Sequence, residues 1–396
     1  MALNTVSSDR LATNVKNTNF TAAEKQDLTD DILPLAGQLG NRNLIINGAM
    51  QVAARATSGS TADGYPSLDR FYTFSSGLDE NPTMSQGSLT SSDTPFSSGF
   101  RKYLRFQNGN QTSGAGASDQ TQFKQAIEAQ NVAQSGWNYT SSSSFITLSF
   151  WIRASVAQTY YGFLKASDGG NYIYPFSMAL SANTWTKVTK TIPGNSNLQI
   201  DNDTGNGLEF VIYPYLGTSF TDNSVSLNAW AAYSSGTTRT PDHTTTWYTT
   251  NDSTIDITGV QLEVGSVATD FEHRSIGQEL ALCQRYYFSF KGDDDEHIVF
   301  GYVAGGGFCN FMLPYPVPMR AAPTYTGSAT AARFYNNSQS ADFNLSSLSF
   351  ANMDTNSVEP KHGAIFITTT SGMVTGNGGS LALNEDNGIL EFSAEL

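Results

Sequence analysis

Three aromatic side chains occupy strand positions from which a flat ring could be presented to a ligand. Trp151 lies on the polar face of an alternating run, and Tyr213 and Tyr215 share the face opposite the aliphatic residues of another. Aromatic rings stack on the apolar faces of sugars, while Asn, Asp and Gln side chains bind the sugar hydroxyls. These residues are therefore candidates for carbohydrate binding. Packing against a covering loop or a neighbouring subunit explains the same rings equally well.

Other side chains that commonly carry chemistry show no catalytic or metal-binding spacing. The histidines have neither HxxxH nor HxH spacing; they are His243, His273, His297 and His362. No G-x-S-x-G, Walker or Rossmann motif is present. The segment 201–207 begins like a calcium loop, but Asn206 and Ile212 stand where an EF-hand needs glycine and glutamate. The sequence therefore predicts neither enzyme activity nor a metal or cofactor.

Acidic residues cluster in two places, and both have structural interpretations. The first cluster is interleaved with His273 and Arg274, and it comprises Glu263, Asp270, Glu272 and Glu279. Glycoside hydrolysis requires two carboxylates at a defined separation, whereas salt bridges at a domain junction explain this cluster more simply. The second, 293–295, is interpreted as a solvated acidic loop rather than a cation site. Cys283 and Cys309 are expected to be reduced, partly buried apolar residues.

Two alternating runs indicate the strands that would position the aromatic candidates. Residues 146–152 alternate aliphatic and aromatic side chains with polar ones, which is typical of a half-buried strand. Trp151 belongs to the opposite face of this run. The run 208–216 alternates in the same way and contains Tyr213 and Tyr215. Because Pro214 has no N–H to donate, we expect this second run to be an edge strand or to end near the proline.

A third run, 255–264, breaks its own alternation. Ile255 and Ile257 share one face, but Val260 and Leu262 have the opposite parity. A bulge at Gly259 would return all of these side chains to the core. Many such short strands, separated by turns rich in Gly, Asn and Ser, are typical of an antiparallel sandwich.

Two short helices are expected outside the strands. Thr21 and Glu24 have the spacing of a capping box, and Leu28 and Ile32 form a short apolar stripe, so residues 1–42 are predicted to be an attachment arm. A frayed tail with a transient helix is the alternative. The second helix follows a capping box at Ser275 and Gln278, with an apolar stripe of Ile276, Leu280, Cys283 and Tyr287. It divides the chain into a sandwich domain, 43–274, a connector, 275–287, and a C-terminal β-domain, 288–396.

Composition excludes several partners. The chain has 396 residues, a net charge of −14, and only 14% charged residues. Phosphate binding needs clustered Lys and Arg, and the 21 basic residues here are scattered, so we expect no nucleic-acid partner. No stretch approaches the roughly 20 apolar residues of a membrane span, and the first residues lack a signal-peptide core. A polar surface typical of extracellular proteins, in a chain without a secretory signal peptide, fits a protein released by cell lysis.

Five segments resemble the tail-fibre and minor virion proteins of tailed bacteriophages, and they bracket about residues 43–325. They are Asn43-Leu-Ile-Ile-Asn-Gly-Ala-Met-Gln51, Tyr65-Pro-Ser-Leu-Asp-Arg-Phe71, Leu148-Ser-Phe-Trp-Ile-Arg-Ala-Ser155, the run from Ile257 to Tyr287, and Leu313-Pro-Tyr-Pro-Val-Pro-Met-Arg-Ala-Ala-Pro323. The fourth segment is long and specific, and it contains Ile257-Thr-Gly-Val-Gln-Leu-Glu-Val-Gly265 and Glu279-Leu-Ala-Leu-Cys-Gln-Arg-Tyr-Tyr287.

The resemblance implies an all-β protein: a jelly-roll sandwich like that of carbohydrate-binding modules, then a second small β-domain. It further implies a homotrimer in the virion, joined to other virion proteins through its arm and adhering to host glycan or lipopolysaccharide without catalysis. A receptor-binding tail fibre is the expected role. A capsid-borne fibre or decoration protein and a polysaccharide depolymerase are the alternatives.

Overall fold

The structure is a computed structural model that describes residues 41–396 apart from 234–238, 306–307, 328–330, 337–340, 353–361, 370–372 and 385–387. The chain divides into two compact units, Met1–Arg42 and Asn43–Leu396. The predicted arm, with Leu28 and Ile32, lies outside the described residues. No helix in the described part of the chain is long and apolar enough to cross a membrane.

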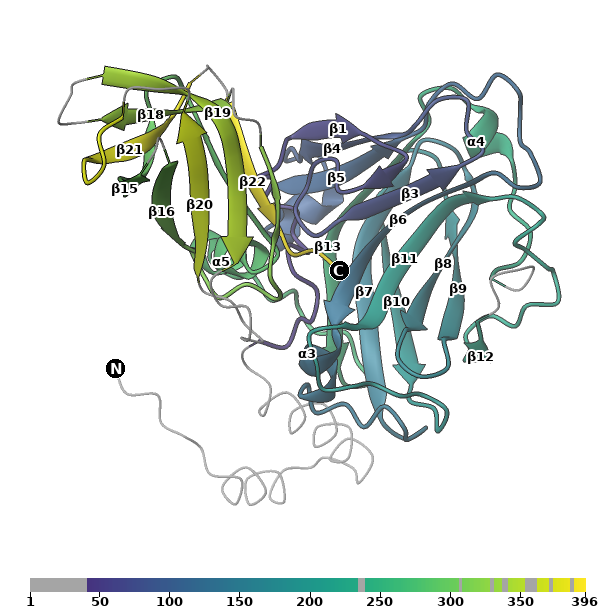
Figure 1. Cartoon of the computed structure of the whole chain (residues 1–396). Coiled ribbons are helices and arrows are strands. Elements are labelled where there is room, and N and C mark those ends of the chain that lie inside the picture. The colour runs from purple at the N-terminus through teal and green to yellow at the C-terminus, as the bar shows by residue number, and fades with distance from the viewer. Residues whose placement is uncertain are drawn as a thin grey trace. The chain divides into compact units, whose positions relative to one another are not determined.

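The first part of the larger unit is a sandwich of two antiparallel sheets (Figure 1). The six-stranded sheet has the order β1-β4-β5-β13-β7-β10. Its strands are β1 (Ser58–Ser60), β4 (Thr83–Ser88), β5 (Lys102–Gln107), β13 (Thr254–Val264), β7 (Phe145–Ala154) and β10 (Thr186–Pro193). The seven-stranded sheet has the order β12-β9-β8-β11-β6-β3-β2. Its strands are β12 (Ala231–Ala232), β9 (Tyr172–Leu180), β8 (Gln158–Ala166), β11 (Asn206–Leu216), β6 (Gln120–Glu128), β3 (Tyr72–Ser76) and β2 (Asp63–Gly64).

The main core lies between these two sheets. In β7, the side chains predicted to face inward are buried and belong to it: Ile146, Leu148, Phe150 and Ile152. They meet inward-facing residues of the other sheet, such as Phe210, whose ring centroid is 5.5 Å from that of Phe150. The alternation read from the sequence therefore describes β7 correctly, because one face of the strand packs on the core.

The predicted bulge in β13 is confirmed. The register between β13 and β7 shifts between Thr258 and Gln261, and Gly259 has a left-handed φ of +65°. Val260 and Leu262 consequently join Ile255 and Ile257 in the main core. Glycine is needed here for a second reason, since a Cβ at position 259 would lie 2.5 Å from the Phe100 ring.

For the run 208–216, the strand does end near the proline, at Leu216, but the expectations of an edge strand and of a shared face for its tyrosines are wrong. β11 is not an edge strand, because it pairs with β6 on one side and β8 on the other. The proline is accommodated by a bulge, in which Tyr213 and Pro214 fall between the pairs that Ile212 and Tyr215 make with β6. This bulge reverses the alternation, so Tyr213 lies on the outer face while Tyr215 belongs to the main core.

Short helical segments lie at the edges of the sandwich, and one longer helix follows it. The short ones are the 3-10 helix η1 (Thr94–Ser98), α3 (Ala129–Ala133) and α4 (Thr246–Thr249). The longer helix, α5 (Ile276–Gln284), begins with the predicted capping box of Ser275 and Gln278. Its predicted apolar stripe is partly wrong: Cys283 is buried, but Ile276 and Leu280 are exposed.

The second part of the larger unit is also all-β. A three-stranded sheet has the order β14-β22-β17, with β14 (Tyr287–Gly292), β22 (Gly388–Ser393) and β17 (Thr324–Thr326). A closed barrel follows the order β15-β16-β20-β19-β18-β21, with β15 (His297–Gly305), β16 (Phe308–Pro314), β20 (His362–Thr369), β19 (Ala341–Asn352), β18 (Ala332–Asn336) and β21 (Gly378–Leu383). The two share a second core that contains Phe288, Phe311 and Phe392. The predicted fold class, a jelly-roll-type sandwich followed by a smaller β-domain, is confirmed.

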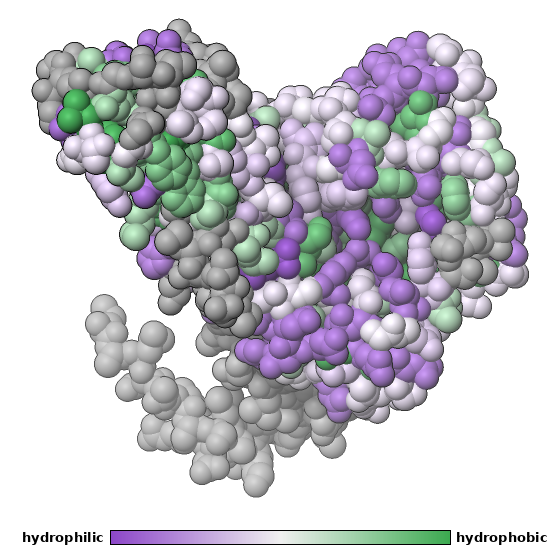
Figure 2. Space-filling view, in the orientation of Figure 1, coloured by the Kyte–Doolittle hydropathy of each residue, from purple (hydrophilic) through white to green (hydrophobic). Residues whose placement is uncertain are grey.

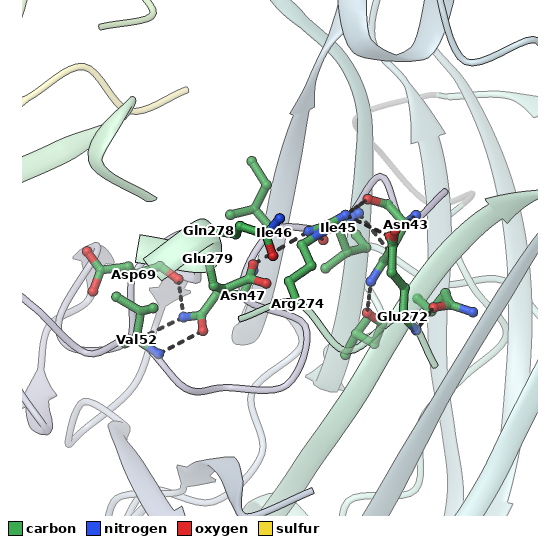
Figure 3. Close-up of polar contacts among 12 residues, drawn as sticks. Asn43, Ile45, Ile46, Asn47, Val52, Asp69, Glu272, Arg274, Gln278 and Glu279 are labelled. Atoms are coloured by element: carbon green, nitrogen blue, oxygen red, sulfur yellow. Dashed lines mark hydrogen bonds and ion pairs between the residues drawn. The ribbon is translucent and has the colours of Figure 1, made fainter. Parts of the chain in front are cut away.

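A polar network holds the segment 43–52 against the residues that precede and begin α5 (Figure 3). The Asn47 side chain donates to the carbonyls of Val52 and Asp69 at 2.8 and 3.0 Å and accepts from the Val52 N–H at 2.9 Å. Arg274 pairs with Glu272 at 3.2 Å and with Glu279 at 3.6 Å. The acidic cluster noted in the sequence is therefore used in part for salt bridges, as expected.

Buried ion pairs join the sandwich to the second β-domain. Arg70 is almost fully buried, pairs with Glu395, and lies 3.4 Å over the ring of Tyr286. Burial alone would lower the pKa of Arg70, but Glu395 raises it above its ordinary value. Glu128 is fully buried and accepts from Arg285 at 2.7 Å. Several residues of the resemblance segments thus serve the packing of this junction.

Candidate binding groove

A groove of about 330 Å³ lies on the outer face of the seven-stranded sheet. Strands β3, β6, β8 and β11 form its floor, and two residues of the loop that follows β12 line it as well. Figure 2 shows hydrophilic residues gathered over this face of the sandwich, with hydrophobic ones between them. The aromatic residues that line the groove are Tyr72, Phe74, Phe163, Tyr213 and Tyr233.

The position of β11 in the middle of this floor follows from its pairing. Glu209 lies opposite Lys165 of β8, and Val211 lies opposite both Phe163 of β8 and Lys124 of β6. Because strand side chains alternate between faces, Leu208, Phe210 and Ile212 enter the core. Glu209 and Val211 point outward into the groove. Both faces of β11 are buried. Its inner face packs in the main core, and its outer face forms part of the groove floor.

One carboxylate stands between two ammonium groups in the groove. Glu209 accepts from Lys124 at 2.8 Å, from Lys165 at 3.4 Å and from the Asn206 amide at 2.7 Å. Burial would raise the pKa of Glu209, but Lys124 and Lys165 lower it below its ordinary value. Glu209 is therefore ionised at neutral pH, and it cannot serve as a proton donor there.

The aromatic side chains form a connected wall and floor. Phe163 lies 5.3 Å from Tyr213 and 6.3 Å from Tyr233, measured between ring centroids. Lys165 lies 5.2 Å from the Tyr233 ring, which places a cation beside an aromatic face. Tyr233 is half-buried, so part of its ring is accessible. Tyr213 is only 2% exposed and forms the groove floor, where its ring is covered by its neighbours.

Trp151 lines a different groove, of about 340 Å³, on the outer face of the six-stranded sheet. Phe100, Phe271 and His273 line it too, and successive rings in this set lie 4.9 Å apart. These rings pack largely on one another. The two grooves belong to opposite sheets, so the structure does not bring Trp151 together with Tyr213.

The third aromatic candidate lies in neither groove. Tyr215 stacks on Tyr248 with 4.3 Å between ring centroids, and both rings are buried in the main core. The expectation that Tyr213 and Tyr215 share a face is wrong because of the bulge at Pro214. Of the three sequence candidates, Tyr213 alone lies in the groove on the seven-stranded sheet.

Apart from Tyr213, the residues that line this groove were not anticipated from the sequence, and they include Lys124, Lys165, Glu209 and Tyr233. A signal for three of them was present. Lys165 and Glu209 each interrupt an otherwise uncharged strand, and Lys124 lies among uncharged residues of β6, which ends with Glu128. Only 14% of the chain is charged. Such isolated charges on strands are costly to bury unless they are paired. Tyr233 belongs to a loop, and no periodicity marks it.

The other clusters that the sequence suggested have structural partners. In the acidic segment 293–295, Asp294 pairs with Arg333 at 2.7 Å, and Asp295 also pairs with Arg333. Cys283 and Cys309 are both free and buried. Among the residues that the structure describes, no three His, Cys, Asp or Glu side chains gather as metal ligands would.

Comparison with known proteins gives structural neighbours only. No family model matches the chain, and no curated protein matches its sequence. A cyclase from Fischerella sp. has a TM-score of 0.31 at 11% identity, over 58% of this chain and 98% of its own. The family 11 carbohydrate-binding module from Clostridium thermocellum, in complex with a mixed-linked tetrasaccharide, has a TM-score of 0.25 at 10% identity, over 54% of this chain and 99% of its own.

A third neighbour is the enzymatically active domain of tailspike protein 4 from bacteriophage CBA120. Its TM-score is 0.29 at 10% identity, over 56% of this chain. The chain spans only 21% of that domain. All three TM-scores lie below 0.5, and the proteins themselves differ in activity. The function proposed below therefore rests on the residues of this chain.

Proposed function

We propose that this protein binds a glycan, without cleaving it, in the groove on the outer face of its seven-stranded sheet. The observation that carries the proposal is the composition of that groove. Half-buried rings of Tyr72 and Tyr233 stand beside the polar side chains of Gln122 and Lys124. Rings of this kind stack on the apolar faces of sugars, and the polar groups bind hydroxyls.

The same groove supports binding rather than hydrolysis. Glycosidases use a pair of carboxyl groups, one of which must donate a proton. Among the described residues that line this groove, Glu209 is the one carboxylate, and its lowered pKa keeps it ionised. A depolymerase activity thus has no proton donor of the usual kind among these side chains.

We place this binding activity on a phage virion, as a tail-fibre protein that adheres to the host surface. The support is the resemblance of the five segments between Asn43 and Pro323 to tail-fibre and minor virion proteins. A capsid-borne fibre or decoration protein is the alternative location. Labelling of virions with an antibody against the chain, followed by electron microscopy, distinguishes the tail from the capsid.

The groove residue Tyr233 provides a test of glycan binding. We expect the intact protein to bind at least one member of an array of bacterial-surface and plant oligosaccharides. Tyr233→Ala should weaken that binding by roughly tenfold or more, since it removes an accessible ring worth about 1.5–3 kcal/mol of apolar contact. Isothermal titration with the bound oligosaccharide measures the change.

Trp151→Ala is the matched control, because it removes an aromatic ring from the groove on the opposite sheet. It should leave the affinity unchanged, and both variants should keep the wild-type melting temperature. If Trp151→Ala abolishes binding while Tyr233→Ala does not, the proposed groove is wrong. Reducing ends released from the bound oligosaccharide during incubation would contradict the non-catalytic role.

We also propose that the protein is a homo-oligomer, a trimer as the resemblance implies. Exposed apolar side chains lie on neighbouring barrel strands, with Phe300 of β15 73% exposed and Met312 of β16 65% exposed. Apolar side chains grouped in this way mark interaction surfaces. The partners that fit them are the same apolar faces of two further copies, gathered around a three-fold axis.

Light scattering tests this assembly. At micromolar concentration, we expect a mass three times the 42.7 kDa of one chain. The double variant Phe300→Lys/Met312→Lys should be monomeric, because each ammonium would have to be desolvated at the interface. Val267→Lys, at another exposed apolar position, should remain a trimer. A monomeric mass for the wild type would refute the proposal.

A further inference from the structure

We infer that the glycan bound in this groove is anionic, carrying a carboxylate or phosphate on the sugar. The inference rests on the proposed glycan-binding function and specifies its ligand. Three cations line the groove, Lys124, Lys165 and Arg239, against the single carboxylate of Glu209. The lining therefore has a net charge of +2, on a chain whose total net charge is −14.

The need to neutralise the Glu209 carboxylate does not explain this excess of positive charge. One ammonium is enough to balance one carboxylate, and Lys124 at 2.8 Å makes the shorter contact. Lys165 adds a second charge at 3.4 Å, although its side chain is only 19% exposed. Holding an extra partly desolvated cation costs free energy unless an anion compensates it. Asp63 accepts a hydrogen bond from the hydroxyl of Tyr72 but does not line the groove. If the charge of Asp63 is counted as well, the net charge of the groove is still positive.

The cations also have hydrogen-bonding capacity for a ligand. An ammonium has three N–H donors, and Glu209 is the one hydrogen-bond acceptor of Lys124 and of Lys165 among the described residues. Arg239 is held in place on the groove wall, where it donates to Gln120 at 2.9 Å and lies 4.6 Å from the Phe220 ring. A negatively charged sugar substituent above Glu209 would receive charge-assisted hydrogen bonds from two sides.

The decisive experiment uses pairs of oligosaccharides that differ only in charge. The intact protein is applied to an array in which each uronic-acid oligosaccharide is printed beside its carboxyl-reduced form, and each phosphorylated one beside its dephosphorylated form. We expect the acidic member of a pair to bind at least tenfold more tightly than its neutral partner. The two kinds of pair show whether the favoured anion is a carboxylate or a phosphate.

Two lysine variants then assign the effect to the groove. Lys165→Gln should reduce the preference for the acidic member over the neutral member to less than threefold. Glu209 keeps Lys124 in that variant, so the fold is retained, and the melting temperature checks this. Lys187→Gln is the control, because it removes a cation from the groove on the opposite sheet and should preserve the preference.

The outcomes separate this inference from the function on which it rests. Binding of acidic and neutral members with equal affinity would refute the anionic ligand and leave glycan binding standing. No binding to any member of the array would refute glycan binding itself. An acidic preference that survives Lys165→Gln but is lost in Lys187→Gln would assign the anion to the other groove and overturn the inference.

Discussion

Gly259→Val is expected to destabilise the sandwich by about 2–5 kcal/mol. A left-handed backbone costs an L-residue about 1–2 kcal/mol, and overpacking in a filled core costs about 1–3 kcal/mol more. Both conditions hold here, since φ is +65° and a Cβ would lie 2.5 Å from the Phe100 ring. This glycine allows the bulge, and because of the bulge the side chains of Val260 and Leu262 point into the core. Urea unfolding of the wild type and the variant measures the loss.

Gly114→Val separates the two causes. Gly114 has a φ of +80°, but nothing lies within 4 Å of its expected Cβ, so this control should cost only about 1–2 kcal/mol. In a double-mutant cycle, Gly259→Val should cost less in the Phe100→Ala background than in the wild type, because the truncated side chain leaves room for the valine. An unchanged unfolding midpoint in Gly259→Val would contradict the role of the bulge.

Glu395→Gln is expected to have a comparable effect at the junction with the second β-domain. Arg70 is 1% exposed, and Glu395 is its ion-pair partner among the described residues. Removing one member of a buried pair leaves the other charge uncompensated, which costs about 3–5 kcal/mol. We expect the melting temperature to fall accordingly in differential scanning calorimetry.

The matched control for this change is Glu296→Gln, which neutralises an exposed carboxylate and should change stability by less than about 0.5 kcal/mol. The double variant Arg70→Met/Glu395→Leu should regain part of the loss, since apolar residues of similar size can replace a buried pair. The recovery is incomplete because Arg55, which pairs with Glu395 at 3.1 Å, still loses this partner. If Glu395→Gln melts like the wild type, the Arg70 charge is compensated by another group.

The strands could be predicted where one face packs on a core and the other does not. That condition holds for β7, and it also allowed the Gly259 bulge to be inferred from a break in parity. It fails for β11, because Val211 and Tyr213 on its outer face pack in a second apolar cluster with Phe163. The central position of the strand comes from its pairing with β6 and β8. Strand neighbours are set by contacts between distant segments, which local periodicity does not contain.

The groove was less predictable than the fold for a related reason. Tyr213 was identified correctly as an outward-facing ring, but its partners come from three other strands and a loop. Lys124 and Lys165 meet Glu209 only once β6, β11 and β8 lie side by side. Trp151 has the same local pattern as Tyr213, yet it belongs to the opposite sheet. Sequence therefore supplied the type of side chain, while topology decided which side chains share a surface.

The bulge at Pro214 divides β11 into two segments with independent parity. The first segment supplies Glu209 and Val211 to the groove, and the second supplies Tyr215 to the core. A gain or loss of one residue at this point would exchange the faces of the second segment without altering the first. Length variation is normally harmful inside a central strand. At Pro214, a change of length would thus exchange the directions of Tyr215 and Leu216 while Glu209 and Val211 keep their places in the groove.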